Sequence, residues 1–104
     1  MKNKHSAADS KFYKEVIASK PPYCEDCGAF IEYPGAVNVA HLNSKGAYPK
    51  MRYDPANVLF LCYSCHNILD FKDKTTLQKW ESQWKNRKDN LIYMYYGRHN
   101  ENNK

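Results

Sequence analysis

The four cysteines of this chain fall into two Cys-x-x-Cys pairs, Cys24 with Cys27 and Cys62 with Cys65. Each short turn directs two sulfur atoms the same way, so two such pairs can meet around one tetrahedral metal ion. A chain of 104 residues has only a modest core, and a bound metal would add stability to it. We therefore expect one domain over residues 1–104, with a structural zinc ion (Zn²⁺) held by these cysteines; the helices and strands predicted below make it an α+β domain.

Paired cysteines can also form disulfides or redox centres. The N-terminal stretch MKNKHSAADSK is polar and no apolar run is long enough to span a bilayer, so we expect a cytoplasmic protein with no membrane partner. In the reducing cytosol such cysteines bind metal more often than they form disulfides. We expect neither pair to have the strand-then-helix context of thioredoxin-like proteins, which argues against a thiol oxidoreductase.

Basic residues outnumber acidic ones and give the chain a net charge of +5. This balance favours a polyanionic partner, most commonly nucleic acid, although charge alone also fits a soluble protein without one. The loop over residues 43–56 carries Lys45, Lys50 and Arg52, and a loop this long in a small domain usually has a function. We expect these side chains to contact nucleic-acid phosphates, with a solvated loop as the alternative.

Apolar spacing predicts the elements of the first two thirds of the chain. A helical stripe predicts a helix over about residues 9–19, capped by Asp9 or Ser10. The stretch AFIEYPGAVNVAHL (29–42) predicts two strands joined by a type II turn at its Pro-Gly step. Residues 58–71 predict a short buried strand, VLFL, followed by a helix that starts at the second cysteine pair.

The C-terminal third predicts a further helix. Residues 75–78 have the Thr-x-x-Gln pattern of a capping box, and a helix over about residues 76–88 should follow it. Residues 91–99 fit either an extension of this helix or a terminal strand, and Gly97 should end it. The apolar stripe of the helix is expected in the core rather than as a base-stacking platform; it comprises Leu77, Trp80 and Trp84.

The central stretch contains a histidine, an asparagine and a histidine at definite spacings. Fifteen residues separate His41 from Asn57, and eight separate Asn57 from His66. With the four cysteines, residues 23–72 resemble the zinc-stapled branch of the HNH endonucleases. The motif H-x-x-S-x-G-A-x-P-x-x-R-Y-D-x-x-N (41–57) is also similar to that of the phage Rap recombination nucleases, which act on branched DNA. The resemblance implies a small ββα-metal (His-Me finger) domain flanked by N- and C-terminal helices.

This resemblance implies a metal-dependent DNA endonuclease that leaves 5′-phosphate and 3′-hydroxyl ends. Phosphodiester hydrolysis needs a base to activate water and a cation to neutralise the charge that develops on phosphate. His41, at a strand end beside a basic loop, suits the first task because the pKa of histidine lies near working pH. The family implies that Asn57 orients this base or touches the metal, and that His66 binds the catalytic Mg²⁺ or Mn²⁺.

One position departs from the family pattern. Where an Asp or His ligand normally precedes the base, this chain has Ala40. Asp70 follows His66 by four residues, which places both on one helix face, where a carboxylate could replace the missing ligand. The alternative for Asp70 is a solvated helix residue. The alternative for the whole chain is a zinc-stapled nucleic-acid-binding module without cleavage activity.

Overall fold

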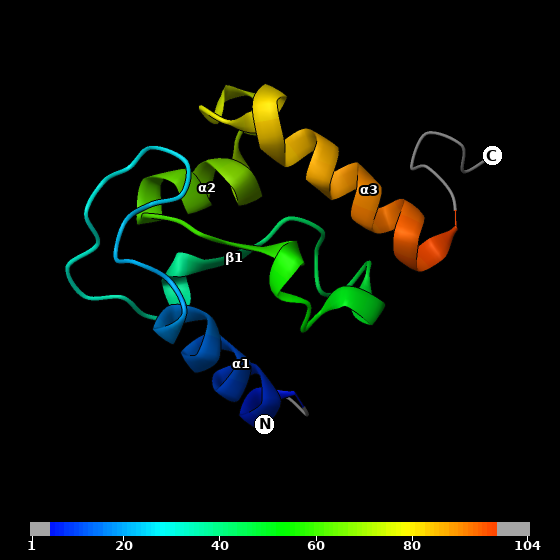
Figure 1. Ribbon diagram of the computed structural model, residues 1–104, viewed down its shortest axis with the longest axis horizontal. Helices are drawn as coiled ribbons and strands as arrows, with labels where there is room; N and C mark the ends of the chain where they lie inside the picture. The colour runs from blue at the N-terminus through cyan, green and yellow to red at the C-terminus, as the bar shows by residue number, and fades with distance from the viewer. Residues whose placement is uncertain (1–4, 98–104) are drawn as a thin grey trace.

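Two short antiparallel strands and the helix that follows them form the centre of the structure (Figure 1). Strand β1 (Val39–His41) pairs with strand β2 (Val58–Phe60), and Ala40 lies opposite Leu59. Helix α2 (Tyr63–Phe71) begins shortly after β2 ends. The predicted order of strand, loop, strand and helix is therefore confirmed.

The computed structural model describes residues 5–97 of the chain. Within them it has three α-helices and a two-stranded sheet, so the expected α+β class is confirmed. None of the helices in this range is both long and apolar enough to cross a membrane. The other helices are α1 (Ser6–Ala18) and α3 (Lys85–Tyr96); 3₁₀ turns occupy Ala36–Asn38, Pro49–Met51, Pro55–Asn57 and Lys74–Thr76, and a π-helical turn occupies Trp80–Trp84.

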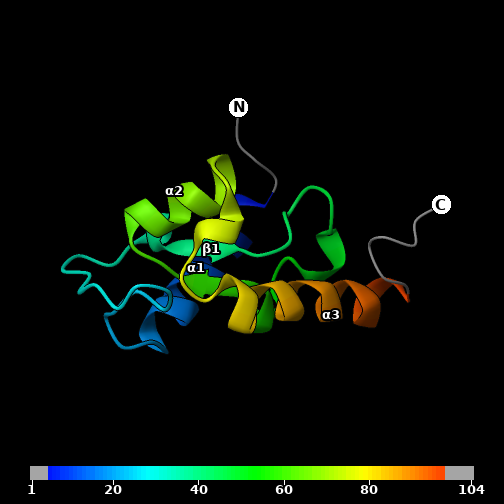
Figure 2. The ribbon, with the colours of Figure 1, turned by 90° about the horizontal axis from the view of Figure 1, so that it is seen from above.

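Helices α1 and α2 lie on the two sides of strand β1, while α3 runs along the β1–β2 loop (Figure 1). Figure 2 shows α3 reaching past the sheet toward one end of the molecule. The larger core cluster packs α2 and the residues before α3 against the sheet, and α1 covers a second cluster. The first includes Leu59, Leu61, Leu69, Trp80 and Trp84, and the second Phe12, Val16, Val39 and Val58.

Residues 29–42 do not form the predicted pair of strands. Only Val39–His41 is a strand, and Gly35 is extended with φ −155°, whereas the predicted type II turn requires a positive φ at this position. The buried side chain of Asn38 accepts a hydrogen bond from Gly35 N and donates one of 2.9 Å to Leu61 O. This side chain ties the segment to the chain after β2 and so prevents the local hairpin.

The C-terminal third forms a different helix from the predicted one. The expected capping box at residues 75–78 is wrong, because Asp73 accepts a hydrogen bond from the backbone at the next turn and caps a 3₁₀ turn instead. The helix expected over 76–88 is replaced by the π-helical turn and α3, which continues to Tyr96. Gly97 ends α3 with φ +74°, as predicted, and the last residues of the 91–99 stretch lie outside the described part. The predicted core stripe is confirmed, with Leu77, Trp80 and Trp84 all buried.

Candidate metal centre and catalytic cleft

The four cysteines of the two predicted pairs meet at one point. Their Sγ atoms all lie within 4.8 Å of one another, and all four are free thiols. The Sγ atoms of Cys27 and Cys62 are 3.7 Å apart. That is close to the edge of about 3.8 Å of a tetrahedron with Zn–S bonds of about 2.3 Å, and well beyond a disulfide bond of about 2.0 Å. The cluster could therefore hold a zinc ion, as the sequence predicts.

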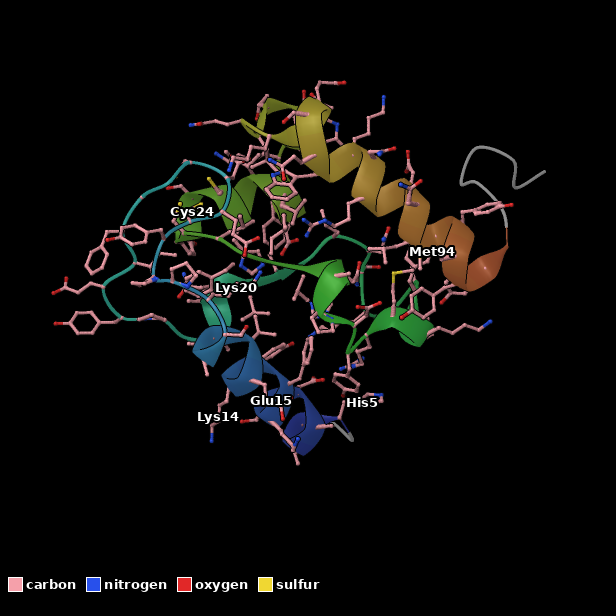
Figure 3. All side chains as sticks on the ribbon, viewed as in Figure 1. His5, Lys14, Glu15, Lys20, Cys24 and Met94 are labelled. Atoms are coloured by element: carbon pink, nitrogen blue, oxygen red, sulfur yellow. The ribbon has the colours of Figure 1, made fainter. Side chains whose placement is uncertain are left out.

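The first pair lies in a tight loop, and Figure 3 shows Cys24 beside α2. Gly28 N donates a hydrogen bond of 3.0 Å to Cys24 O, and Gly28 has φ +82°, which glycine adopts without strain. Burial alone would raise the pKa of Cys24, but backbone N–H groups directed at its sulfur outweigh this and lower the pKa to about 7. This sulfur is therefore suited to bind metal as a thiolate.

The second pair, Cys62 and Cys65, opens α2 directly after β2. The expected lack of a strand-then-helix context is therefore wrong for this pair. A thioredoxin-like centre uses a single pair, whereas here both pairs share one cluster. This convergence favours metal binding over thiol chemistry, and it fixes the start of α2 to the loop around the first pair.

His41, the last residue of β1, has one ring nitrogen free to accept a proton. Its Nε2 lies 3.0 Å from Arg52 O. A carbonyl oxygen only accepts, so Nε2 carries the hydrogen and Nδ1, which has no hydrogen-bond partner among residues 5–97, keeps its lone pair. The rings of Phe12 and Tyr13 flank the imidazole, with centroids 6.4 and 6.3 Å away. Burial lowers the pKa of His41, so the neutral ring persists below its usual range.

His66 and Asp70 lie one turn apart on α2, as their spacing predicts. The Nδ1 of His66 is 2.5 Å from Val37 O, and its Nε2 is 2.9 Å from Asp70 Oδ2. Since Val37 O only accepts, Nδ1 must carry a hydrogen. In a neutral ring the Nε2 lone pair would then face a carboxylate oxygen, which is repulsive. A cation held between Nε2 and Oδ2 would relieve this repulsion, and a metal ion bound by both side chains is one such cation.

One open cleft of about 450 Å³ brings these residues together. It is lined by His41 from β1, His66 and Asp70 from α2, and Ser44 and Lys45 from the start of the β1–β2 loop. Three residues singled out by sequence spacing thus share one solvent-accessible space. A substrate in this cleft would lie beside the free ring nitrogen of His41, the His66–Asp70 pair and Lys45 at the same time.

The three basic residues of the β1–β2 loop lie in different surroundings. Lys45 is half-buried in the cleft, and its Nζ donates a 3.0 Å hydrogen bond to Tyr13 Oη. Lys50 is exposed, with its Nζ 4.9 Å from the centre of the Tyr96 ring, and it does not line the cleft. Of these two, only Lys45 is placed to meet a phosphate beside His41.

Arg52 has an acidic partner inside the protein instead of a free charge. Its Nε and Nη2 donate to both carboxylate oxygens of Asp9, at 3.0 and 2.8 Å, and Tyr53 Oη donates to Asp9 at 2.7 Å. The guanidinium hydrogen bonds lower the pKa of Asp9 to about 2. Asp9 is not the expected helix cap, because α1 begins earlier, at Ser6. We therefore assign Arg52 to holding the loop against α1 rather than to a phosphate contact.

Asn57 is wholly buried and neither orients the His41 ring nor faces the cleft. Its Oδ1 accepts from Asn43 N at 3.0 Å, and its Nδ2 donates to Asn43 O at 3.0 Å and to Met51 O at 3.3 Å. These bonds close the two ends of the β1–β2 loop on each other. The role implied by the family resemblance is thus replaced by a structural one, which acts on His41 only through the path of the loop.

Ala40 also lies away from the cleft. It is 0 % exposed and packs in the core cluster with Leu59 and Leu69. Its neighbours Val39 and His41 line the cleft, because successive strand residues point to opposite faces. The position that supplies a metal ligand in the family is here part of the core.

Several contributors to the site had no sequence pattern to reveal them. Asp9 and Arg52 are 43 positions apart, so no local spacing links them. Tyr13 lines the cleft but belongs to the apolar stripe of α1, which predicts core packing. Ser44 lines the cleft as well, and its only signal in the sequence is its place in the motif over residues 41–57.

Comparison of the chain with protein-family models, curated proteins and solved structures found no significant match. The likeness to HNH endonucleases thus stays a resemblance of motif, and the site is described by its own geometry.

Proposed function

We propose that this protein is an HNH-type, metal-dependent endonuclease that hydrolyses phosphodiester bonds of DNA. The observation that carries the proposal is the meeting of His41 with His66 and Asp70 in one open cleft. His41 offers a free lone pair, and the other two side chains lie 2.9 Å apart, close enough to hold one cation together. A base and a cation are the two components that such hydrolysis requires.

The order of the central elements supports assigning residues 23–72 to the ββα-metal fold. Strands β1 and β2 are antiparallel, the loop between them is long, and α2 follows with a cysteine pair at its start. The proposed structural zinc would hold α2 in place and so fix the histidine and aspartate that it carries. In this assignment the zinc takes no part in the reaction.

His41 would start the reaction by taking a proton from water onto Nδ1. The water oxygen then attacks phosphorus, and the bond from phosphorus to the 3′-oxygen breaks. The leaving oxygen takes a proton from solvent, which gives a 3′-hydroxyl and a 5′-phosphate. Arg52 O keeps Nε2–H in place, so Nδ1 is the nitrogen that faces the water throughout.

His66 Nε2 and Asp70 Oδ2 would hold the catalytic Mg²⁺ or Mn²⁺. Their separation of 2.9 Å would allow both side chains to bind the same ion. Such an ion would neutralise charge on the phosphate and on the departing oxygen. Val37 O fixes the ring tautomer that leaves Nε2 free, as a backbone carbonyl does for many metal-binding histidines.

DNA is the proposed polyanion because the cleft joins this site to a basic residue. Lys45 lines the same cleft as His41, and the chain has a net charge of +5. Lysines placed on a phosphate path position the backbone without reading the sequence. Binding should therefore weaken steeply as salt rises.

A plasmid-nicking assay tests the proposal. Supercoiled plasmid is incubated with wild type, His41→Ala or His5→Ala, with Mn²⁺, Mg²⁺ or no divalent cation. We expect nicked and linear products from wild type and His5→Ala only when a divalent cation is present, and none from His41→Ala. His5 does not line the cleft, so His5→Ala controls for the loss of a histidine elsewhere, and an inactive His41→Ala preparation excludes a contaminating nuclease. Equal cleavage by His41→Ala, or no cleavage by folded, zinc-loaded wild type, would overturn the proposal.

The alternative function is a zinc-stapled nucleic-acid-binding module that does not cut. The buried Ala40, which leaves the cation one ligand fewer than the family pattern, is the observation that favours it. DNA binding by wild type with no cleavage in Mn²⁺ or Mg²⁺ is the outcome that would select this alternative.

A further inference from the structure

A second hollow adjoins the cleft, and the two share part of their lining. It has a volume of about 240 Å³ and is lined by Lys74 and Lys88. His41, Asp70 and Ser44 line both hollows, whereas Lys45 lines only the first. The two lysines lie outside the stretch that resembles the HNH family, and no motif drew attention to them.

The backbone at Lys88 is fixed to the β1–β2 loop. Asn43 Nδ2 donates hydrogen bonds of 3.2 Å to Lys88 O and of 3.2 Å to Asn57 Oδ1. Asn43 is 1 % exposed, so this contact is shielded from water. The side chain of Lys88 therefore starts from a defined point in the wall of the second hollow.

Within residues 5–97 the two lysines have no acidic partner. Neither Nζ lies within ion-pair distance of a carboxylate in the described part of the chain, and both side chains are partly buried. Burial lowers the pKa of Lys88; the charge of Lys74 lowers it further, against an opposite effect of Asp89. Two unpaired cations that face one hollow are stabilised when an anion enters it.

We infer that Lys74 and Lys88 bind a backbone phosphate of DNA next to the one at His41. The inference rests on the proposed function for the place of the cut, but the phosphate site itself needs only the two lysines. Together with Lys45, they would make the DNA backbone cross the site from the first hollow to the second. Asp70 lines both hollows, and its Oδ2 is turned to His66 Nε2 at 2.9 Å.

Lysine footprinting on the wild-type protein tests the site directly. The protein is acetylated with and without a 20-base-pair duplex, in buffer without divalent cations, and each lysine is quantified by mass spectrometry. Lys85 is the matched control, since it is exposed on α3 and lines neither hollow. We expect acetylation of Lys74 and Lys88 to fall severalfold with DNA and that of Lys85 to stay unchanged. Equal protection of all three, or of none, would overturn the inference.

A second measurement compares Lys74→Gln, Lys88→Gln and Lys85→Gln, which lower the net charge equally. The slope of log Kd against log salt should flatten by about one unit for each of the first two variants and stay unchanged for the third. Zinc content and circular dichroism confirm that each variant is folded. Slopes that are equal for all three variants would overturn the inference.

These measurements separate this inference from the proposed nuclease function. Both are made without a divalent cation, so they read binding and not cleavage. Protection of Lys74 and Lys88 in a protein that never cuts DNA would support the phosphate site and overturn the nuclease. Cleavage without protection of these lysines would do the reverse.

Discussion

The indole Nε1 of Trp84 donates a 2.8 Å hydrogen bond to Oδ1 of Asp26, a residue that is 3 % exposed inside the first cysteine pair. The same carboxylate accepts from Gln78 N at 2.9 Å and from Lys79 N at 2.8 Å. One acidic side chain thus holds the segment before α3 to the loop of the cysteine cluster. This contact also fixes the helix that carries Lys88.

Replacing Asp26 with Asn should lower the free energy of unfolding by about 2 kcal/mol, because an amide cannot accept all of these hydrogen bonds and leaves a buried donor unpaired. Glu25→Gln is the matched control. Its carboxylate pairs with Lys20 near the surface, where an ion pair contributes less than about 1 kcal/mol. Urea denaturation measures both variants, and equal losses would contradict the anchoring role of Asp26.

Removing the metal should unfold the domain, because a structural zinc contributes its binding free energy to folding. Metal analysis should find one zinc per chain, and Cys62→Ser should lose both the zinc and cooperative thermal unfolding. Ser64→Ala, between the two cysteines of the same pair, should keep both. A folded Cys62→Ser protein with a full complement of zinc would contradict the proposed four-cysteine centre.

Cleavage should persist below the ordinary pKa of histidine, 6.5, because burial lowers the pKa of His41. As the pH falls, the base is lost only when the ring takes a proton, so a lowered pKa moves the acid limb of log(kcat/KM) below pH 6.5. The measurement is the pH profile of nicking at saturating Mn²⁺. A midpoint above 6.5 would contradict the assignment of His41 as a buried neutral base.

Asp70→Ala should need at least about tenfold more Mn²⁺ for half-maximal cleavage, because the proposed ion loses its carboxylate ligand. Asp73→Asn is the control, since this exposed residue caps the next turn and Asn can also cap. Cleavage measured against Mn²⁺ concentration compares the metal requirement of the two variants with that of wild type. If Asp70→Ala titrates like wild type, the ion is held without this residue.

Asp9→Asn should lower the free energy of unfolding by about 2 kcal/mol at neutral pH, as a carboxyl pKa lowered from 3.8 to about 2 implies. A depressed pKa in the folded state stabilises it above the unfolded pKa, and this contribution is lost only as the pH falls from 3.8 toward 2. The difference between wild type and variant should therefore stay constant between about pH 5 and pH 8.

A double-mutant cycle with Arg52→Gln checks the source of this energy. If the Asp9–Arg52 pair supplies it, the two substitutions together should cost clearly less than the sum of their separate costs. Strict additivity would place the effect elsewhere.

The elements predicted correctly are those with a local pattern. The two cysteine pairs, β2, α2 and the His66–Asp70 spacing all follow from residues within a turn or two of one another. The meeting of the four cysteines was also predicted, because metal binding is one of few roles open to two cysteine pairs in a small domain.

The features that were missed depend on partners far along the chain. The helix expected over residues 76–88 gives way to a π-helical turn whose Trp84 is bonded to Asp26, 58 positions earlier. The expected hairpin fails because Asn38 bonds to Leu61. Residue propensity and apolar periodicity describe one segment at a time, so they could not predict either of these long-range contacts.

The group that orients the His41 ring is a backbone carbonyl, Arg52 O, which no amino-acid substitution removes. An alanine scan removes the base at His41 but never this carbonyl, which a substitution of Arg52 or Asn57 can displace only by changing the path of the loop. Chemical synthesis reaches this contact, since replacing the Arg52–Tyr53 peptide bond with an ester weakens that oxygen as an acceptor. The orientation of the base thus depends on the path of the backbone, which the Asp9–Arg52 and Asn43–Asn57 contacts hold.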